Sequence, residues 1–238
     1  MAKKKIPWEE YLEKISEMLS TLSPEQHDIL LQHVSAVKFK KNDIIYKEGD
    51  LPTYLFCLIS GKVKIYKEGV GGRSQIVRVL GETEYFGYRA YMANEPFVTG
   101  ASAFEPCIVL KVPMGIIIKF IQENPQLGWF FIQKLARDLG QSDERTVSLT
   151  QKHIRGRLAE SLLFLKESYG LEEDESTLSI YLSREDLANL SNMTTANAIR
   201  TLSAFAAEKL VAIDGRKIKF INIAELENIS RIADRTGE

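Results

Sequence analysis

The sequence predicts an α+β chain in three parts: an antiparallel β-barrel, a long helix, and a small domain in which two short helices precede a β-hairpin. Short β-rich runs alternate with turn residues between positions 37 and 112, as in small antiparallel barrels and sandwiches. A helical pattern then fills residues 126–151, and the Asp214-Gly215 pair marks a hairpin turn. We therefore divide the chain into residues 1–125, 126–151 and 152–238.

Composition favours folded domains without a membrane anchor. The chain has 238 residues, of which 45% are hydrophobic and 26% charged, which argues against wholesale disorder. No stretch approaches the ~18 apolar residues that a membrane span needs. The basic start is followed by charged residues rather than by the apolar core of a signal peptide, so we expect a cytoplasmic protein. The net charge of −1 means that any nucleic-acid site must arise from local charge arrangement.

The N-terminal part combines helices with strands. Residues 8–35 have helical spacing, and Ser23-Pro24 is a typical helix start with a serine cap. Strands are expected at residues 37–39, 43–46, 54–59, 62–66, 74–80 and 107–112. Cys57 and Cys107 lie in apolar strand runs and are expected to be buried free thiols. Without a Cys-x-x-Cys motif, neither a zinc ribbon nor a cysteine-ligated iron–sulfur cluster is supported. His27, His33 and His153 leave haem binding open, but each is better explained as a surface or helix-face histidine.

The long helix has the spacing of a dimer seam. Pro113 opens a first helix that ends at Asn124, and Pro125 starts the second. Positions in the second repeat at intervals of 3, 4, 3, 4 and 3 residues: Ile132, Leu135, Leu139, Ser142, Thr146 and Leu149. This spacing is typical of a two-stranded coiled coil and predicts a homodimer. The alternative is a helix packed on its own barrel.

The third part contains a predicted helix-turn-helix. Ser183 caps the first helix, with Asp186 three residues later in a pattern resembling a capping box. Asn192 suits a left-handed turn conformation, and Thr194 caps a second helix over residues 195–205. The apolar side chains expected to share one core are Leu187, Leu190, Ala198, Ile199, Leu202 and Phe205.

The second helix then exposes short polar groups and one arginine, as a helix that enters a DNA major groove requires. The hairpin tip is basic, which suits a wing that contacts phosphates. Either feature alone is common in proteins that do not bind DNA, but their combination predicts a DNA-binding winged helix-turn-helix. The acidic residues 172–175 are expected to lie away from the DNA. The predicted DNA contacts are Arg184, Thr194, Thr195, Asn197, Arg200, Arg216 and Lys217.

These motifs together resemble the Crp–Fnr superfamily of the cyclic-AMP receptor and the fumarate–nitrate regulator. The resemblance covers nearly the whole chain and is carried by residues 56–66 (FCLISGKVKIY), 84–88 (EYFGY), 154–159 (IRGRLA) and 182–190 (LSREDLANL). It implies a cyclic-nucleotide-binding-like jelly roll and a homodimeric transcription regulator, not an enzyme. It also implies a two-fold symmetric DNA operator and contact with RNA polymerase.

The chain departs from the family where cyclic nucleotides bind. Tyr88 stands where those members have the glutamate that holds the ribose, and Phe97-Val98 replaces the Arg-Ser pair that holds the cyclic phosphate. Without a paired cation the phosphate would be poorly held, so the family's usual cAMP contacts are not expected. The candidate effector pocket comprises Tyr88, Arg89, Phe97, Val98, Ser142 and Asp143. A filled pocket that binds nothing remains the alternative.

Other functional classes have weaker support. A metal-dependent barrel enzyme needs histidine ligands, and residues 37–112 contain no histidine. The glycine-rich run at 69–72 is not a Gly-x-Gly-x-x-Gly motif and does not open a helix. The alternative function is a cyclic-nucleotide-responsive signalling or interaction module that does not bind DNA.

Overall fold

A computed structural model describes residues 9–69 and 74–231, which fall into two compact units. The described residues of the first unit run to Glu68 and from Val77 to Leu139. Those of the second are Gly69, residues 74–76 and residues 140–231. Among these described residues, no helix is long and apolar enough to cross a bilayer.

The first unit begins with short helices: η1 (Glu9–Ile15), α1 (Ser16–Leu19) and α2 (Pro24–His33). The predicted helix start is confirmed, because the Ser23 hydroxyl accepts from the Gln26 amide at 3.2 Å while the Gln26 side chain accepts from the Ser23 amide. This reciprocal pair is a capping box, which satisfies two backbone donors at the N-terminus of α2.

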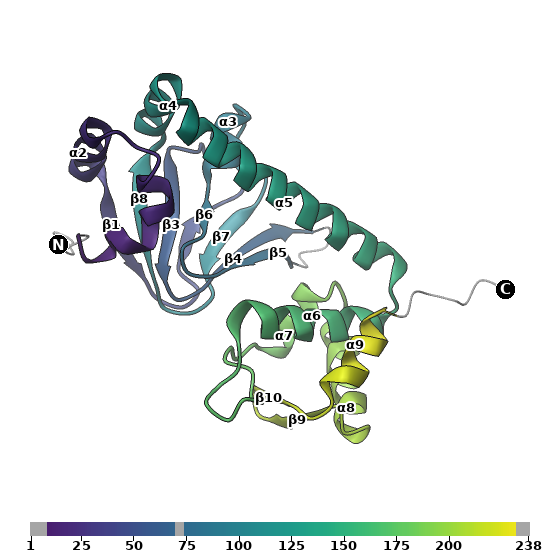
Figure 1. Cartoon of the computed structure of the whole chain (residues 1–238). Helices are drawn as coiled ribbons and strands as arrows, with labels where there is room; N and C mark the ends of the chain where they lie inside the picture. Colours follow the sequence, from purple (N-terminus) through teal and green to yellow (C-terminus); the bar gives the residue numbers. More distant parts are fainter. Residues whose placement is uncertain (1–8, 70–73, 232–238) are drawn as a thin grey trace. The chain divides into compact units, whose positions relative to one another are not determined.

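Two four-stranded sheets form the body of this unit (Figure 1). The first has the order β1-β8-β3-β6 and the second β2-β7-β4-β5, and the pairs with a described register are antiparallel. The bounds are β1 Ser35–Phe39, β2 Ile44–Tyr46, β3 Tyr54–Ser60, β4 Val63–Glu68, β5 Ser74–Leu80, β6 Tyr85–Phe86, β7 Gly100–Ala103 and β8 Cys107–Pro113.

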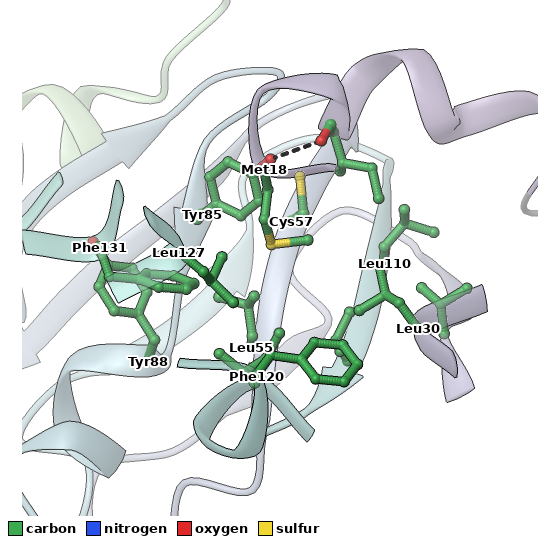
Figure 2. Packing of buried hydrophobic residues seen from close by; sticks show 14 of the residues in the cluster. Met18, Leu30, Leu55, Cys57, Tyr85, Tyr88, Leu110, Phe120, Leu127 and Phe131 are labelled. Atoms are coloured by element: carbon green, nitrogen blue, oxygen red, sulfur yellow. Dashed lines mark hydrogen bonds between the residues drawn. The ribbon is translucent and has the colours of Figure 1, made fainter. Parts of the chain in front are cut away.

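Strand β3 is buried on both faces, which explains its unbroken apolar run. Leu55 and Cys57 belong to a core shared with the helices, whereas Phe56 and Leu58 belong to a core formed by strands of both sheets. Figure 2 shows the first of these cores, in which the Tyr85 hydroxyl donates to the Ile15 carbonyl at 3.5 Å. Both cysteines are free and buried, as predicted.

Three elements were not predicted from the sequence: β6, helix α3 (Tyr88–Met92) and β7. Strand β7 consists of glycine, alanine and serine, which carry little strand propensity. Its composition follows from close packing, because a Cβ atom on Gly100 would lie 2.6 Å from the Tyr66 ring. The strand is therefore specified by a neighbour that is distant in sequence.

Two helices follow the strands, α4 (Met114–Glu123) and α5 (Pro125–Gln151). The predicted break between them near Pro125 is confirmed. One face of α5 enters the core through Leu127, Phe130 and Phe131, and the partly buried Leu135, a residue of the predicted seam, packs against the same cluster. On the other side, Ile132 and Leu139 are exposed.

The second unit contains α6 (Ile154–Tyr169), α7 (Arg184–Leu190), α8 (Thr195–Ala207), β9 (Val211–Asp214), β10 (Lys217–Phe220) and α9 (Ile223–Arg231). Strands β9 and β10 pair antiparallel as the predicted wing. Residues 176–178 lie along the other edge of β10, with the Leu178 amide 2.9 Å from the Ile218 carbonyl and the Phe220 amide 2.8 Å from the Ser176 carbonyl. The wing therefore carries a third extended segment.

Candidate nucleic-acid interface

Two side-chain caps define the helix pair α7–α8. The Ser183 hydroxyl accepts from the Asp186 amide at 3.0 Å and donates to the Asp186 carboxylate at 2.7 Å. Thr194 caps α8 by accepting from the Asn197 amide at 3.2 Å. Between the helices, Asn192 has the predicted left-handed conformation, with φ of 48°. Each cap satisfies an otherwise unpaired backbone donor, so both helix starts are fixed by the local sequence.

The exposed face of α8 differs from the prediction at Ile199. This side chain is 45% exposed, whereas Ala198, Leu202 and Phe205 are buried. Successive residues of an α-helix point about 100° apart. Ala198, Leu202 and Phe205 therefore share one face of α8, and Ile199 points away from that face. The assignment of Ile199 to the core is therefore wrong. The residues exposed on α8 from its start to Ser203 are Thr195, Ala196, Ile199, Arg200 and Ser203.

Arg200 and Asn197 interact on this helix. The Arg200 guanidinium donates to the Asn197 side-chain oxygen at 2.5 Å. In the part of the chain that the structure describes, no carboxylate pairs with Arg200. The guanidinium is thus oriented at the surface by a neutral group.

The wing is joined to α7 and is partly neutralised by acidic residues. Arg184 donates to the Gly215 carbonyl at the hairpin tip at 2.8 Å. The Lys217 ammonium lies 3.6 Å from the Glu172 carboxylate, and Lys219 lies 3.3 Å from that of Asp174. The extended segment 176–178 places the acidic loop of residues 172–175 beside the wing, and the position of this loop relative to DNA stays a prediction.

The turn between α7 and α8 is held by two arginines that sequence reasoning did not single out. Arg145 donates to the Leu190 carbonyl at 2.9 Å, and burial lowers the pKa of its guanidinium. Arg157 donates to the Ser191 carbonyl at 3.2 Å and the Asn192 carbonyl at 3.3 Å. These bonds satisfy carbonyl groups that the end of α7 leaves unpaired.

The candidate effector residues have separate partners in the structure. The buried Tyr88 places its hydroxyl 3.5 Å from the Asp138 carboxylate. Arg89 is exposed and ion-paired with Glu95 at 2.7 Å. Phe97 is 6% exposed and stacks on the Tyr46 ring with a centroid distance of 3.8 Å.

The remaining three candidates are all exposed. Val98 is 45% exposed beside the buried Phe97. Ser142 and Asp143 are exposed on the part of α5 that belongs to the second unit.

A polar cluster of the first unit was also missed. Arg78 of β5 forms an ion pair with Asp138 of α5 at 2.6 Å and lies 3.7 Å from Glu84. Burial raises the pKa of Glu84, and the Gly81 amide that donates to its carboxylate opposes this shift. The sequence signal was a single arginine within residues 76–80, the otherwise apolar part of β5.

The fold and the α7–α8 face together define a DNA-binding transcription regulator with a winged helix-turn-helix, and comparisons with known proteins agree. The cyclic nucleotide-binding domain family matches residues 36–124, and the Crp-like helix-turn-helix domain family matches residues 156–229. The two matches occur in the order that the resemblance implied.

Relatives match over nearly the full length. The chain is 26% identical over 217 residues to the cyclic AMP receptor protein of Thermus thermophilus, covering 91% of this chain and 98% of the relative. It is 22% identical over 213 residues to a CRP-like cAMP-activated global transcriptional regulator of Mycobacterium tuberculosis, covering 89% and 94%. The structure of FixK2 from Bradyrhizobium japonicum superposes with a TM-score of 0.76 at 21% identity, covering 84% and 98%. The chain belongs to the Crp–Fnr superfamily of transcription regulators.

Proposed function

We propose that this chain acts in the cytoplasm as a homodimer that binds a two-fold symmetric DNA operator and contacts RNA polymerase. The observation that carries the proposal is the exposed face of α8, which presents Arg200 and short polar side chains on a helix capped at Thr194. Such a helix fits the major groove, where arginine reads guanine and asparagine reads adenine. The effector domain, dimer helix and DNA-binding domain correspond to residues 1–125, 126–151 and 152–238.

The proposed DNA contacts divide into two kinds. Thr195, Asn197 and Arg200 lie in the N-terminal half of α8, the part of a recognition helix that contacts base edges. Arg216 and Lys217 at the wing tip reach phosphates. The remaining two proposed contacts, Arg184 and Thr194, begin α7 and cap α8, where side chains and backbone amides fix register on the duplex.

The outer face of α5 supports pairing with a second copy of this chain. Trp129, Ile132 and Leu139 are 59%, 54% and 63% exposed, and Ala136 and Asp143 continue the spacing of 3, 4, 3 and 4 residues. This is a heptad stripe on the side of α5 opposite Leu127 and Phe131. The proposed seam keeps Ile132 and Leu139 from the sequence prediction. It differs in that Ala136, rather than Leu135, faces the partner.

Cyclic nucleotides do not fit the residues of the first unit. The relatives named above are a cyclic AMP receptor and a cAMP-activated regulator, but here aromatic rings fill the core between the sheets. Phe97 stacks on Tyr46, and Phe56 stacks on Phe86 with a centroid distance of 5.0 Å. A cyclic phosphate placed there would replace apolar packing and would lose its hydration without compensation.

Two arginines near this core already have acidic partners. Arg78 and Arg89, whose charges oppose the rise in the pKa of Tyr46 that burial causes, are paired with Asp138 and Glu95 respectively. We propose that the barrel responds to a different effector or is held by its own side chains, and that DNA binding does not require cAMP or cGMP.

Selection of random duplex DNA by the purified protein, with and without cyclic nucleotides, tests the proposal. The expected result is a two-fold symmetric site that is enriched equally in both conditions. Arg200→Ala should then cost about 1–3 kcal/mol and relax one position of each half-site, whereas Lys217→Ala should weaken binding evenly across sequences. Enrichment only with nucleotide would overturn the effector proposal. Absence of any enriched site would favour the interaction module.

A further inference from the structure

We propose that Ile199 reads the methyl group of a thymine in each operator half-site, next to the base that Arg200 contacts. This inference rests on the proposed function and deepens it, because it assigns sequence discrimination to a side chain that makes no hydrogen bond. The starting observation is its position: Ile199 is the one large apolar side chain among the exposed residues of α8, at 45% exposure.

Single exposed apolar residues are common on protein surfaces, so exposure alone does not indicate a function for Ile199. Its position on α8 does. It lies on the same face as Thr195, Ala196 and Ser203. These neighbours are short, so the branched side chain of Ile199 projects beyond them. The helix gains nothing from it locally, because a β-branched residue has lower helix propensity than alanine.

The chemistry of the major groove supplies a matching partner. The thymine C5-methyl is the apolar group that base pairs present there, and apolar side chains recognise it by contact. Removing both surfaces from water is favourable, whereas cytosine or a purine at that position would leave Ile199 against polar edges. Ile199 therefore selects against the other bases as well as for thymine.

The neighbouring arginine fixes where this thymine lies. Arg200 follows Ile199 directly, and its guanidinium is oriented by the Asn197 oxygen at 2.5 Å. Consecutive residues on a helix are separated by a rise of 1.5 Å and about 100°, so the two side chains reach adjacent base steps. The expected half-site therefore contains a guanine with a thymine within about one base step.

Deoxyuridine substitution isolates the methyl group. The operator is first obtained by the selection described above, and each thymine is then replaced by deoxyuridine, which keeps every hydrogen-bonding group. With the unmutated protein, replacing one particular thymine of a half-site should lower the affinity for the operator about fourfold. Replacing this thymine in both half-sites should lower the affinity about fifteenfold. With Ile199→Ala, the same replacement should change affinity by less than twofold, which completes a double-mutant cycle.

Ile221→Ala is the matched control, because Ile221 is an equally large side chain, 55% exposed, in the same unit but outside α8. This variant should keep the fourfold sensitivity to deoxyuridine. The inference is overturned if a symmetric operator is enriched but no thymine is methyl-sensitive, or if Ile199→Ala retains the sensitivity. If no symmetric operator is enriched, the proposed function fails as well, so the two failures are distinguishable.

Discussion

Replacing Glu172 by glutamine tests whether the acidic loop limits DNA binding by the wing. The Glu172 carboxylate lies 3.6 Å from the Lys217 ammonium and accepts from the Tyr181 hydroxyl. Lys217 also lies over the Tyr181 ring, 5.3 Å from its centroid. Glutamine keeps an acceptor for Tyr181 and removes the charge. The variant therefore frees Lys217 for a DNA phosphate without disturbing the packing of the loop.

The size of the effect follows from the exposure of the pair. The two side chains are 51% and 32% exposed, and exposed ion pairs contribute about 0.2–1 kcal/mol. The Lys217–Glu172 ion pair must break before Lys217 reaches a DNA phosphate. Removing the Glu172 charge should therefore increase the affinity for non-specific DNA by about 1.4- to 5-fold. Each additional phosphate contact also steepens the dependence of log affinity on log salt concentration by up to about 0.9.

Asp174 is less suitable for this test because it holds the loop. Its carboxylate accepts from the Thr177 amide at 2.7 Å and the Ser176 amide at 3.0 Å, and these bonds lower its pKa. Asp174→Asn would therefore alter backbone geometry as well as charge, and any change in DNA affinity would have two causes.

Binding to a random-sequence duplex across a salt series measures the effect of Glu172→Gln. Glu105→Gln is the matched control, because it makes the same change of charge in the first unit. It also breaks an ion pair with a lysine, since the Glu105 carboxylate lies 3.0 Å from the Lys62 ammonium. Glu172→Gln should raise affinity and steepen the salt slope, and the control should change neither beyond its effect on net charge. Equal behaviour of the two variants would refute electrostatic competition by the loop.

Three further variants test separate parts of the structure. Leu139→Lys places a charge on the exposed stripe of α5 and should shift the protein towards monomer in sedimentation; an unchanged dimer would exclude this face. Thr194→Ala removes the cap of α8 and should lower unfolding free energy by about 1 kcal/mol in urea titration, and an effect near zero would contradict the capping role. Glu84→Gln should raise the urea midpoint at pH 7 but not at pH 4. Burial raises the folded-state pKa of Glu84 above its usual 4.5, so stability from the protonated group is present below pH 4.5 and is lost as pH rises through the folded-state pKa. A gain of equal size at both pH values would contradict this account.

The sequence predicted the elements that carry local signals. Helix α5 has the predicted start because Pro125 fixes it, and the α2 and α7 caps follow from Ser23 and Ser183. Strand β7 could not be predicted, because its small residues are explained by the Tyr66 ring across the sheet. Local patterns thus identify helix ends and amphipathic strands, whereas close packing between distant segments leaves a weak signal.

The candidate site was predictable to a similar degree. The helix-turn-helix followed from caps, turn chemistry and apolar spacing, but Ile199 was misplaced because an apolar residue next to Ala198 was assumed to share its face. The pairs Lys217–Glu172 and Arg78–Asp138 join residues 45 and 60 positions apart. No periodic pattern encodes such pairs, so the partial neutralisation of the wing could be found only in the structure.

The arginines at the α7–α8 turn give a physical route from α5 to the recognition helix. Arg157 donates to the Lys152 carbonyl just beyond α5, at 3.1 Å, and also to the turn carbonyls of Ser191 and Asn192. Arg145, within α5, holds the Leu190 carbonyl. A rotation of the end of α5 must therefore move this turn or break charge-assisted hydrogen bonds, each contributing about 1.5–3 kcal/mol. Within the second unit, the orientation of the recognition helix is therefore tied to that of residues 140–151 of α5.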